Sequence, residues 1–121
     1  MKKEIDSFEA YVSVYEFLGE IYDQQDDEGL GALLGSMRIN PGDGNPMDSA
    51  MKQVWLTIVN NHFPNQKVFN LDESYSLMIS FLKAMEYSWL PNKLLDDLIS
   101  KNPESVMSWE RAVDMVIFNY R

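Results

Sequence analysis

The chain contains no cysteine, a single histidine and, between Glu4 and Glu28, no lysine or arginine. Without cysteine it cannot form a disulfide, a thiolate nucleophile or a cysteine-ligated zinc site. His62 has no serine or cysteine that the sequence places beside it, so a position at a helix end is favoured over catalysis. Glycine loops that bind nucleotides and the ligand order of an EF-hand are also missing. We therefore expect no enzymatic activity, no cofactor and no metal site.

No stretch of the chain reaches the roughly 18 to 20 consecutive apolar residues that a membrane span requires. The N-terminus runs from two lysines into an acidic amphipathic segment and lacks the apolar core of a secretory signal. A cytoplasmic protein without membrane contact is expected. The 121 residues, 45% of them hydrophobic and 12% aromatic, are enough for one folded domain that spans residues 1–121.

Apolar residues recur at spacings of three and four along most of the chain, as in amphipathic helices. The pattern predicts an all-α fold, a compact bundle of about six helices. The first helix is expected from Ile5 to Gln24. Pro91 is expected to end the fourth helix, and the last helix is expected to begin after Asn102. Asn45 or Asp48 is expected to cap the third helix, and Asp72 the fourth.

The two halves of the sequence resemble each other. Each half gives a long helix, a short helix and a helix that carries a tryptophan. At an offset of 64 residues, the matching pairs include Tyr11 with Tyr75, Phe17 with Phe81 and Leu18 with Leu82. This similarity predicts an internal duplication that relates residues 5–62 to residues 71–121. The alternative is that apolar residues at helical spacing coincide by chance.

Nine acidic side chains lie between Glu4 and Glu28, and they account for the net charge of −9 because the rest of the chain is nearly neutral. On a helical wheel, four of these acids fall within roughly 60° of one another, opposite the apolar stripe. These four are Glu9, Glu16, Glu20 and Asp23. Exposed helix faces usually mix acids with lysine, because like charges four residues apart cost a few tenths of a kcal/mol. An uncompensated acidic ridge therefore indicates a surface for a positively charged partner, and it disfavours nucleic acid.

Several segments in residues 15–56 resemble a family of small bacterial helical proteins. The segments are Phe17-Leu-Gly-Glu-Ile-Tyr22, Gly29-Leu-Gly-Ala-Leu-Leu-Gly-Ser-Met37, Asp43-Gly-Asn-Pro-Met-Asp48 and Trp55. Several members of that family are immunity proteins of contact-dependent growth inhibition and related polymorphic toxin systems. The resemblance implies a protein that neutralises a cognate toxin, but it identifies no binding residue.

The charge pattern and the resemblance together predict an immunity protein that blocks a basic toxin domain, a nuclease being expected, by steric and electrostatic means. An acidic adaptor or regulatory module and a small enzyme that uses carboxylates are the alternatives. We expect the partner surface to combine the acids of the first helix, the acidic turn and a later loop. Its residues would be Glu9, Glu16, Glu20, Asp23, Asp26, Asp27, Glu28, Asp43 and Asn45.

Overall fold

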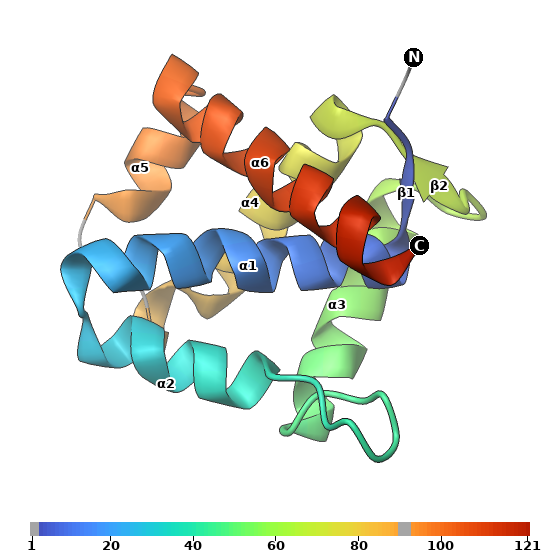
Figure 1. The fold of residues 1–121 in the computed structure, drawn as a ribbon, viewed down its shortest axis with the longest axis horizontal. Coiled ribbons are helices and arrows are strands. Elements are labelled where there is room, and N and C mark those ends of the chain that lie inside the picture. The colour runs from blue at the N-terminus through green and yellow to red at the C-terminus, as the bar shows by residue number, and fades with distance from the viewer. Residues whose placement is uncertain (1–2, 90–92) are drawn as a thin grey trace.

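The computed structural model describes residues 3–89 and 93–121. This part of the chain folds into six helices and one pair of two-residue strands, which confirms the predicted all-α bundle (Figure 1). The elements in chain order are β1 (Ile5–Asp6), α1 (Ser7–Gln25), α2 (Glu28–Met37), α3 (Ser49–His62), β2 (Val68–Phe69), α4 (Leu71–Trp89), α5 (Leu94–Ile99) and α6 (Pro103–Tyr120). Pro91 lies outside the described residues.

Helix α1 lies at the centre of the bundle, with α6 along one side and α2 along the other (Figure 1). Helix α4 passes behind α1 and also contacts α2, while α3 and α5 pack against α4. The side of α1 that faces away from α4 lies between α2 and α6. This open side carries the candidate site.

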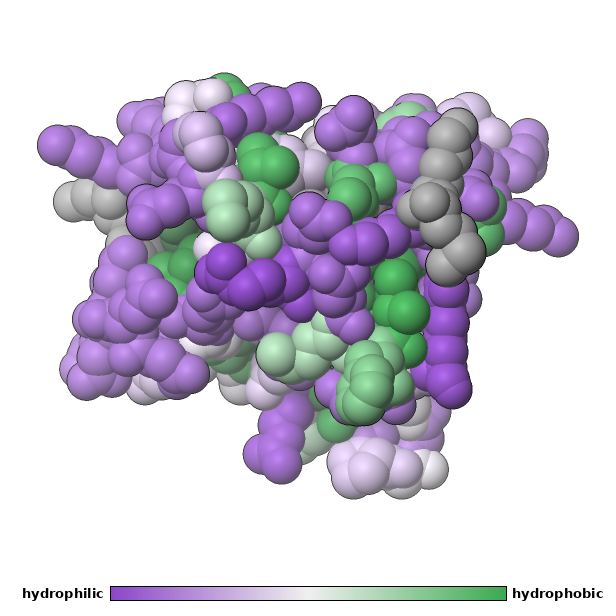
Figure 2. All heavy atoms as spheres, turned by 45° about the horizontal axis from the view of Figure 1, so that its top comes forward, coloured by the Kyte–Doolittle hydropathy of each residue, from purple (hydrophilic) through white to green (hydrophobic). Residues whose placement is uncertain are grey.

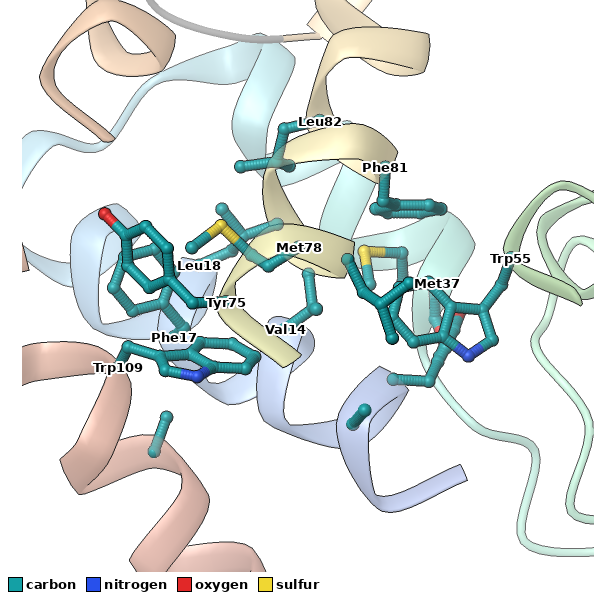
Figure 3. Packing of buried hydrophobic residues seen from close by; sticks show 14 of the residues in the cluster. Val14, Phe17, Leu18, Met37, Trp55, Tyr75, Met78, Phe81, Leu82 and Trp109 are labelled. Atoms are coloured by element: carbon teal, nitrogen blue, oxygen red, sulfur yellow. The ribbon is translucent and has the colours of Figure 1, made fainter. Parts of the chain in front are cut away.

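The core contains two aromatic clusters, one at each end of the row of side chains in Figure 3. In the first, the ring of Trp55 lies 5.9 Å from Tyr11 and 5.6 Å from Phe81 between centroids. In the second, the ring of Trp109 lies 5.8 Å from Phe17 and 6.4 Å from Tyr75. All four pairs are edge-to-face, the favoured geometry for aromatic rings.

The tyrosines and phenylalanines of the two clusters match at the offset of 64 residues, while the two tryptophans lie 54 residues apart. Each tryptophan contacts the tyrosine of its own half and the phenylalanine of the other half. The hydroxyl of Tyr11 donates to the carbonyl of Met37 at the end of α2, over 2.9 Å. The hydroxyl of Tyr75 donates to the carbonyl of Leu98 near the end of α5, over 2.6 Å. The internal duplication stays a prediction, but its matched positions occupy equivalent places in one shared core.

Side-chain caps determine where several helices begin. The predicted box at α1 is present: the Glu9 N–H donates to Asp6 Oδ1 at 2.8 Å, and the Asp6 N–H donates to Glu9 Oε1 at 2.9 Å. Asp48 caps α3, and Asn102 caps α6 just before Pro103. These bonds satisfy backbone donors that have no partner within the helix.

The start of α4 differs from the prediction. Asn70, not Asp72, exchanges hydrogen bonds with Glu73, because the Glu73 N–H donates to Asn70 Oδ1 and the Asn70 N–H donates to Glu73 Oε1. This is a second capping box, placed where β2 ends. Asn45 does not cap α3 either, since its side-chain oxygen accepts from Lys52.

The strands β1 and β2 were not predicted from the sequence; they pair antiparallel with Ile5 opposite Phe69. The first helix was expected from Ile5, but the extended backbone of its cap, Asp6, holds Ile5 outside the helix. Ile5 and Phe69 are both buried. The short strand pair therefore closes the core where α1 and α4 begin. Among the residues that the structure describes, no helix is long and apolar enough to cross a bilayer.

Candidate functional site

A groove of about 850 Å³ lies over the open side of α1, between α2 and α6. We call it the acidic groove, because four of the side chains that line it are the carboxylates Glu16, Glu20, Asp23 and Glu28. Its apolar lining comes from Tyr15, Leu34, Ala112 and Met115. Three of the four acids come from α1, where a spacing of three or four residues places them on one face. Glu28 is added by the first turn of α2.

Most of the groove's negative charge has no counterion among residues 3–89 and 93–121. The described residues make four ion pairs, and none of them includes Glu16, Asp23 or Glu28. Glu20 alone is paired, with Arg111 Nη2 at 2.7 Å from its Oε1. By contrast, Glu110 and Asp114 on α6 both pair with Lys3. Glu110 and Asp114 therefore share a counterion, whereas Glu16, Asp23 and Glu28 have none among the described residues.

Glu9 does not belong to this surface, so the predicted ridge of four acids is wrong at that position. The residue is only 8% exposed. Its carboxylate closes the capping box with Asp6 and accepts from Arg121 Nε at 2.8 Å and Nη2 at 3.0 Å. The hydrogen bonds from Arg121 hold the pKa of Glu9 below its ordinary value of 4.5. Glu9 therefore stabilises the start of α1 and its contact with the end of the chain.

Replacing Glu9 with Gln is expected to lower the free energy of unfolding by about 1 kcal/mol at pH 7. Gln keeps an oxygen for the Asp6 N–H but loses the charge that pairs with the partly exposed Arg121. Because the folded pKa of Glu9 is depressed, its contribution is present above the unfolded pKa and is lost as the pH falls through the folded value. Urea unfolding should show the two proteins converging below pH 4.5. A difference that persists at acid pH would contradict this assignment.

The acidic turn between α1 and α2 is held by its own backbone and side chains. Asp26 ends α1 in the left-handed conformation, and its N–H donates to the Tyr22 carbonyl at 2.7 Å. Asp27 caps α2 by accepting from the Leu30 N–H at 2.9 Å. The neighbouring Asp26 carboxylate raises the pKa of the Tyr22 phenol, and the charges of Asp23 and Glu28 also raise it. The negative field of the turn therefore extends to the groove.

Close approach of α1 and α2 at this end depends on Gly31. A Cβ atom at Gly31 would lie 2.8 Å from Cε1 of Tyr22, which is too near for ordinary contact. The absent side chain thus lets the Tyr22 ring lie against α2, where both residues line the groove. A Cβ at Gly35, in the same helix, would meet nothing within 4 Å.

The two glycines of α2 make a matched pair. Gly35→Ala is expected to raise the free energy of unfolding by about 0.5 to 1 kcal/mol, because alanine favours a helix interior and meets no atoms there. Gly31→Ala gains the same helix propensity but displaces the Tyr22 ring, so its net gain should be smaller or negative. Urea unfolding of both variants measures the difference. Equal stabilisation by the two variants would contradict this, because it would show that the Tyr22 ring can shift without a cost in free energy.

Asp43 and Asn45 are not brought to the groove. They lie in the loop between α2 and α3, while the acidic turn lies at the other end of α2 (Figure 1). Asp43 Oδ1 accepts from the Asn45 N–H at 2.9 Å and so shapes the loop. Asn45 lines a separate apolar cavity of about 180 Å³ beside Trp55. The acids of α1 and this loop therefore form two different surfaces.

The sequence did not predict that α6 forms one wall of the groove. Met107, Arg111, Met115 and Phe118 fall within roughly 80° on a helical wheel, and all are exposed although three of them are apolar. Phe118 is 86% exposed. Figure 2 shows hydrophobic patches between hydrophilic side chains on the face that carries α1 and α6. Apolar residues on both faces of the last helix were the signal available in the sequence.

His62 does have a serine neighbour in the structure, which the sequence did not suggest. Its Nε2 lies 3.0 Å from Ser80 Oγ on α4, and its Nδ1 lies 3.0 Å from the Ile58 carbonyl. An Nδ1–H that donates to this carbonyl leaves Nε2 to accept from the serine hydroxyl. Neither residue lines the acidic groove. The pair joins α3 to α4 on the surface.

In residues 3–89 and 93–121, no group of three or more His, Asp or Glu side chains is arranged to hold a metal ion. Comparison of the chain with protein-family models, curated proteins and solved structures gives no match. The candidate site is therefore defined by its own residues: four carboxylates, an apolar lining and one arginine.

Proposed function

We propose that the protein is an inhibitor of the immunity type, which binds a basic toxin domain through the acidic groove and blocks it without catalysis. The toxin class expected from the charge is a nuclease, because such enzymes present positive surfaces to nucleic acid. The carboxylates of the inhibitor would then occupy the surface that the phosphates need.

The unpaired state of Glu16, Asp23 and Glu28 is the observation that carries the proposal. Carboxylates left free around a concave surface repel one another, and this repulsion is relieved when a cationic partner binds. The same field attracts the partner from a distance, and steered association reaches about 10⁸ to 10⁹ M⁻¹s⁻¹. A toxin inhibitor benefits from fast capture, since free toxin damages its own cell.

The exposed apolar side chains beside the groove support tight binding rather than attraction alone. Charged rims mainly set the association rate, while buried apolar contacts slow dissociation. Met115 lines the groove, and Met107 and Phe118 extend the apolar surface along α6. An adaptor for another basic protein would use the same surface, and it remains the second candidate. A small enzyme that uses the groove carboxylates is the third candidate.

Co-expression provides the test. The reading frame that neighbours this gene is cloned, its C-terminal domain is produced with and without the protein, and survival and complex formation are measured. Protection together with a stable complex is the expected result. A complex without toxicity or protection would favour the adaptor. Neither protection nor a complex would overturn the toxin assignment.

A further inference from the structure

The ion pair between Glu20 and Arg111 divides two cavities. Both residues line the acidic groove, and both also line a second cavity of about 440 Å³ between α1, α5 and α6. The second cavity is bordered by further acids, Asp97 and Glu104, and by the exposed Met107. Arg111 thus places one positive charge between two negatively charged hollows. If this side chain moved, the two hollows would join along α1.

The pair is built so that it separates at little cost. The side chain of Arg111 is 56% exposed and that of Glu20 is 37% exposed. Ion pairs this open to water contribute about 0 to 1 kcal/mol. Arg111 Nη2 also donates to Ser108 Oγ at 2.9 Å within α6. The guanidinium therefore still has a hydrogen-bond acceptor when another cation pairs with Glu20.

The surface on either side favours one kind of occupant. Acids lie along α1, and the apolar side chains Met107, Met115 and Phe118 lie along the neighbouring α6, so an acidic strip adjoins an apolar strip. An amphipathic helix with a basic edge and an apolar edge matches both strips. A second copy of this chain does not, because both copies carry a net charge of −9. Nucleic acid is repelled for the same reason.

We propose that Arg111 occupies the position that a cationic side chain of the partner takes in the complex. The partner then places a basic amphipathic helix across the acidic groove and the second cavity. An arginine or lysine of that helix replaces Arg111 at Glu20, while its apolar residues cover Met115 and Phe118. The inference rests on the proposed function in that it uses the same groove, but it specifies what the partner presents.

The test uses a synthetic peptide of about 18 residues, made of leucine, lysine and arginine with the leucines at helical spacing. Binding to the full chain is measured by calorimetry at low and moderate salt. Arg111→Gln removes the internal competitor, so the dissociation constant for the peptide is expected to fall about twofold to fivefold. Lys83→Gln is the matched control, because it removes one exposed positive charge on α4, away from the groove. Glu20→Gln should weaken binding instead.

Three results would overturn the inference. Equal tightening by Arg111→Gln and Lys83→Gln would show that only net charge changed. Equal binding of a scrambled peptide of the same composition would rule out the helical occupant. Unchanged binding in Glu20→Gln would remove this carboxylate from the contact. The co-expression test is independent of these results: protection with no effect of Arg111→Gln retains the function alone, and tightened peptide binding without protection retains the groove alone.

Discussion

The double substitution Glu16→Lys with Glu20→Lys is expected to slow association with a basic partner by about 10- to 1,000-fold at low salt. Each substitution replaces a negative charge with a positive one, a change of +2, and both positions line the acidic groove. Lysine at position 20 would also repel Arg111, which now pairs with Glu20. Stopped-flow mixing with the co-expressed toxin domain, or with the basic peptide, measures the association rate.

Salt provides the first internal check on this result. Steering between exposed charges is screened over about 10 Å at 0.1 M salt, so the two proteins should differ less as salt is raised. The dissociation rate should change less than the association rate, because exposed carboxylates mainly guide the encounter. A loss confined to the dissociation rate would indicate that these acids act as buried contacts.

The matched control is Asp72→Lys with Asp96→Lys, which changes the net charge equally, from −9 to −5. Both aspartates are exposed and start other helices, α4 and α5, and neither lines the groove. An equal slowing in this control would show that overall charge, and not the groove, steers the partner. Asp43→Lys tests whether the contact extends to the loop between α2 and α3. The separation of that loop from the acidic turn leads us to expect a small effect.

The sequence predicted the helices well because the signals that define them are local. Apolar spacing and the Asp6–Glu9 box are contained within a few residues of chain. The two-residue strands gave no such signal, since their stability comes from pairing Ile5 with Phe69, far along the chain. Asn70 was missed as a cap for the same reason: it follows a strand that the sequence did not reveal.

The candidate site was predicted in part. The correct part rests on residues close together in the sequence, and the missed part on contacts between distant residues. The wheel of α1 correctly placed Glu16, Glu20 and Asp23 together, because one helix sets their spacing. It failed for Glu9, which is buried and whose carboxylate accepts from Arg121, 112 residues away. It also gave no view of the wall formed by α6, because which face of a helix meets another helix is decided by packing. Arg111 was not predicted as a site residue, because its place in the groove is evident only from its ion pair with Glu20.

Substitution of either core tryptophan by alanine is expected to lower the free energy of unfolding by about 3 to 5 kcal/mol. Trp109 and Trp55 are both buried, and each has two edge-to-face aromatic neighbours. Each indole N–H also has an acceptor: Ser74 Oγ at 3.2 Å for Trp109, and the Ser7 carbonyl at 2.9 Å for Trp55. Urea unfolding should give similar losses for the two variants, because the two tryptophans have similar surroundings. Each loss is a large part of the total free energy of unfolding, which is about 5 to 15 kcal/mol for a small domain.

The two variants should nevertheless differ in binding. Trp109 lies on the inner face of α6, whose outer face carries Arg111 and Met115, so its removal loosens the wall of the acidic groove. Trp55 fixes α3, which contributes nothing to the groove. Under conditions in which both variants are folded, Trp109→Ala should weaken binding of the basic peptide while Trp55→Ala leaves it near the wild-type value. Equal weakening would mean that α6 does not form the contact, because a general loss of stability would then explain both variants.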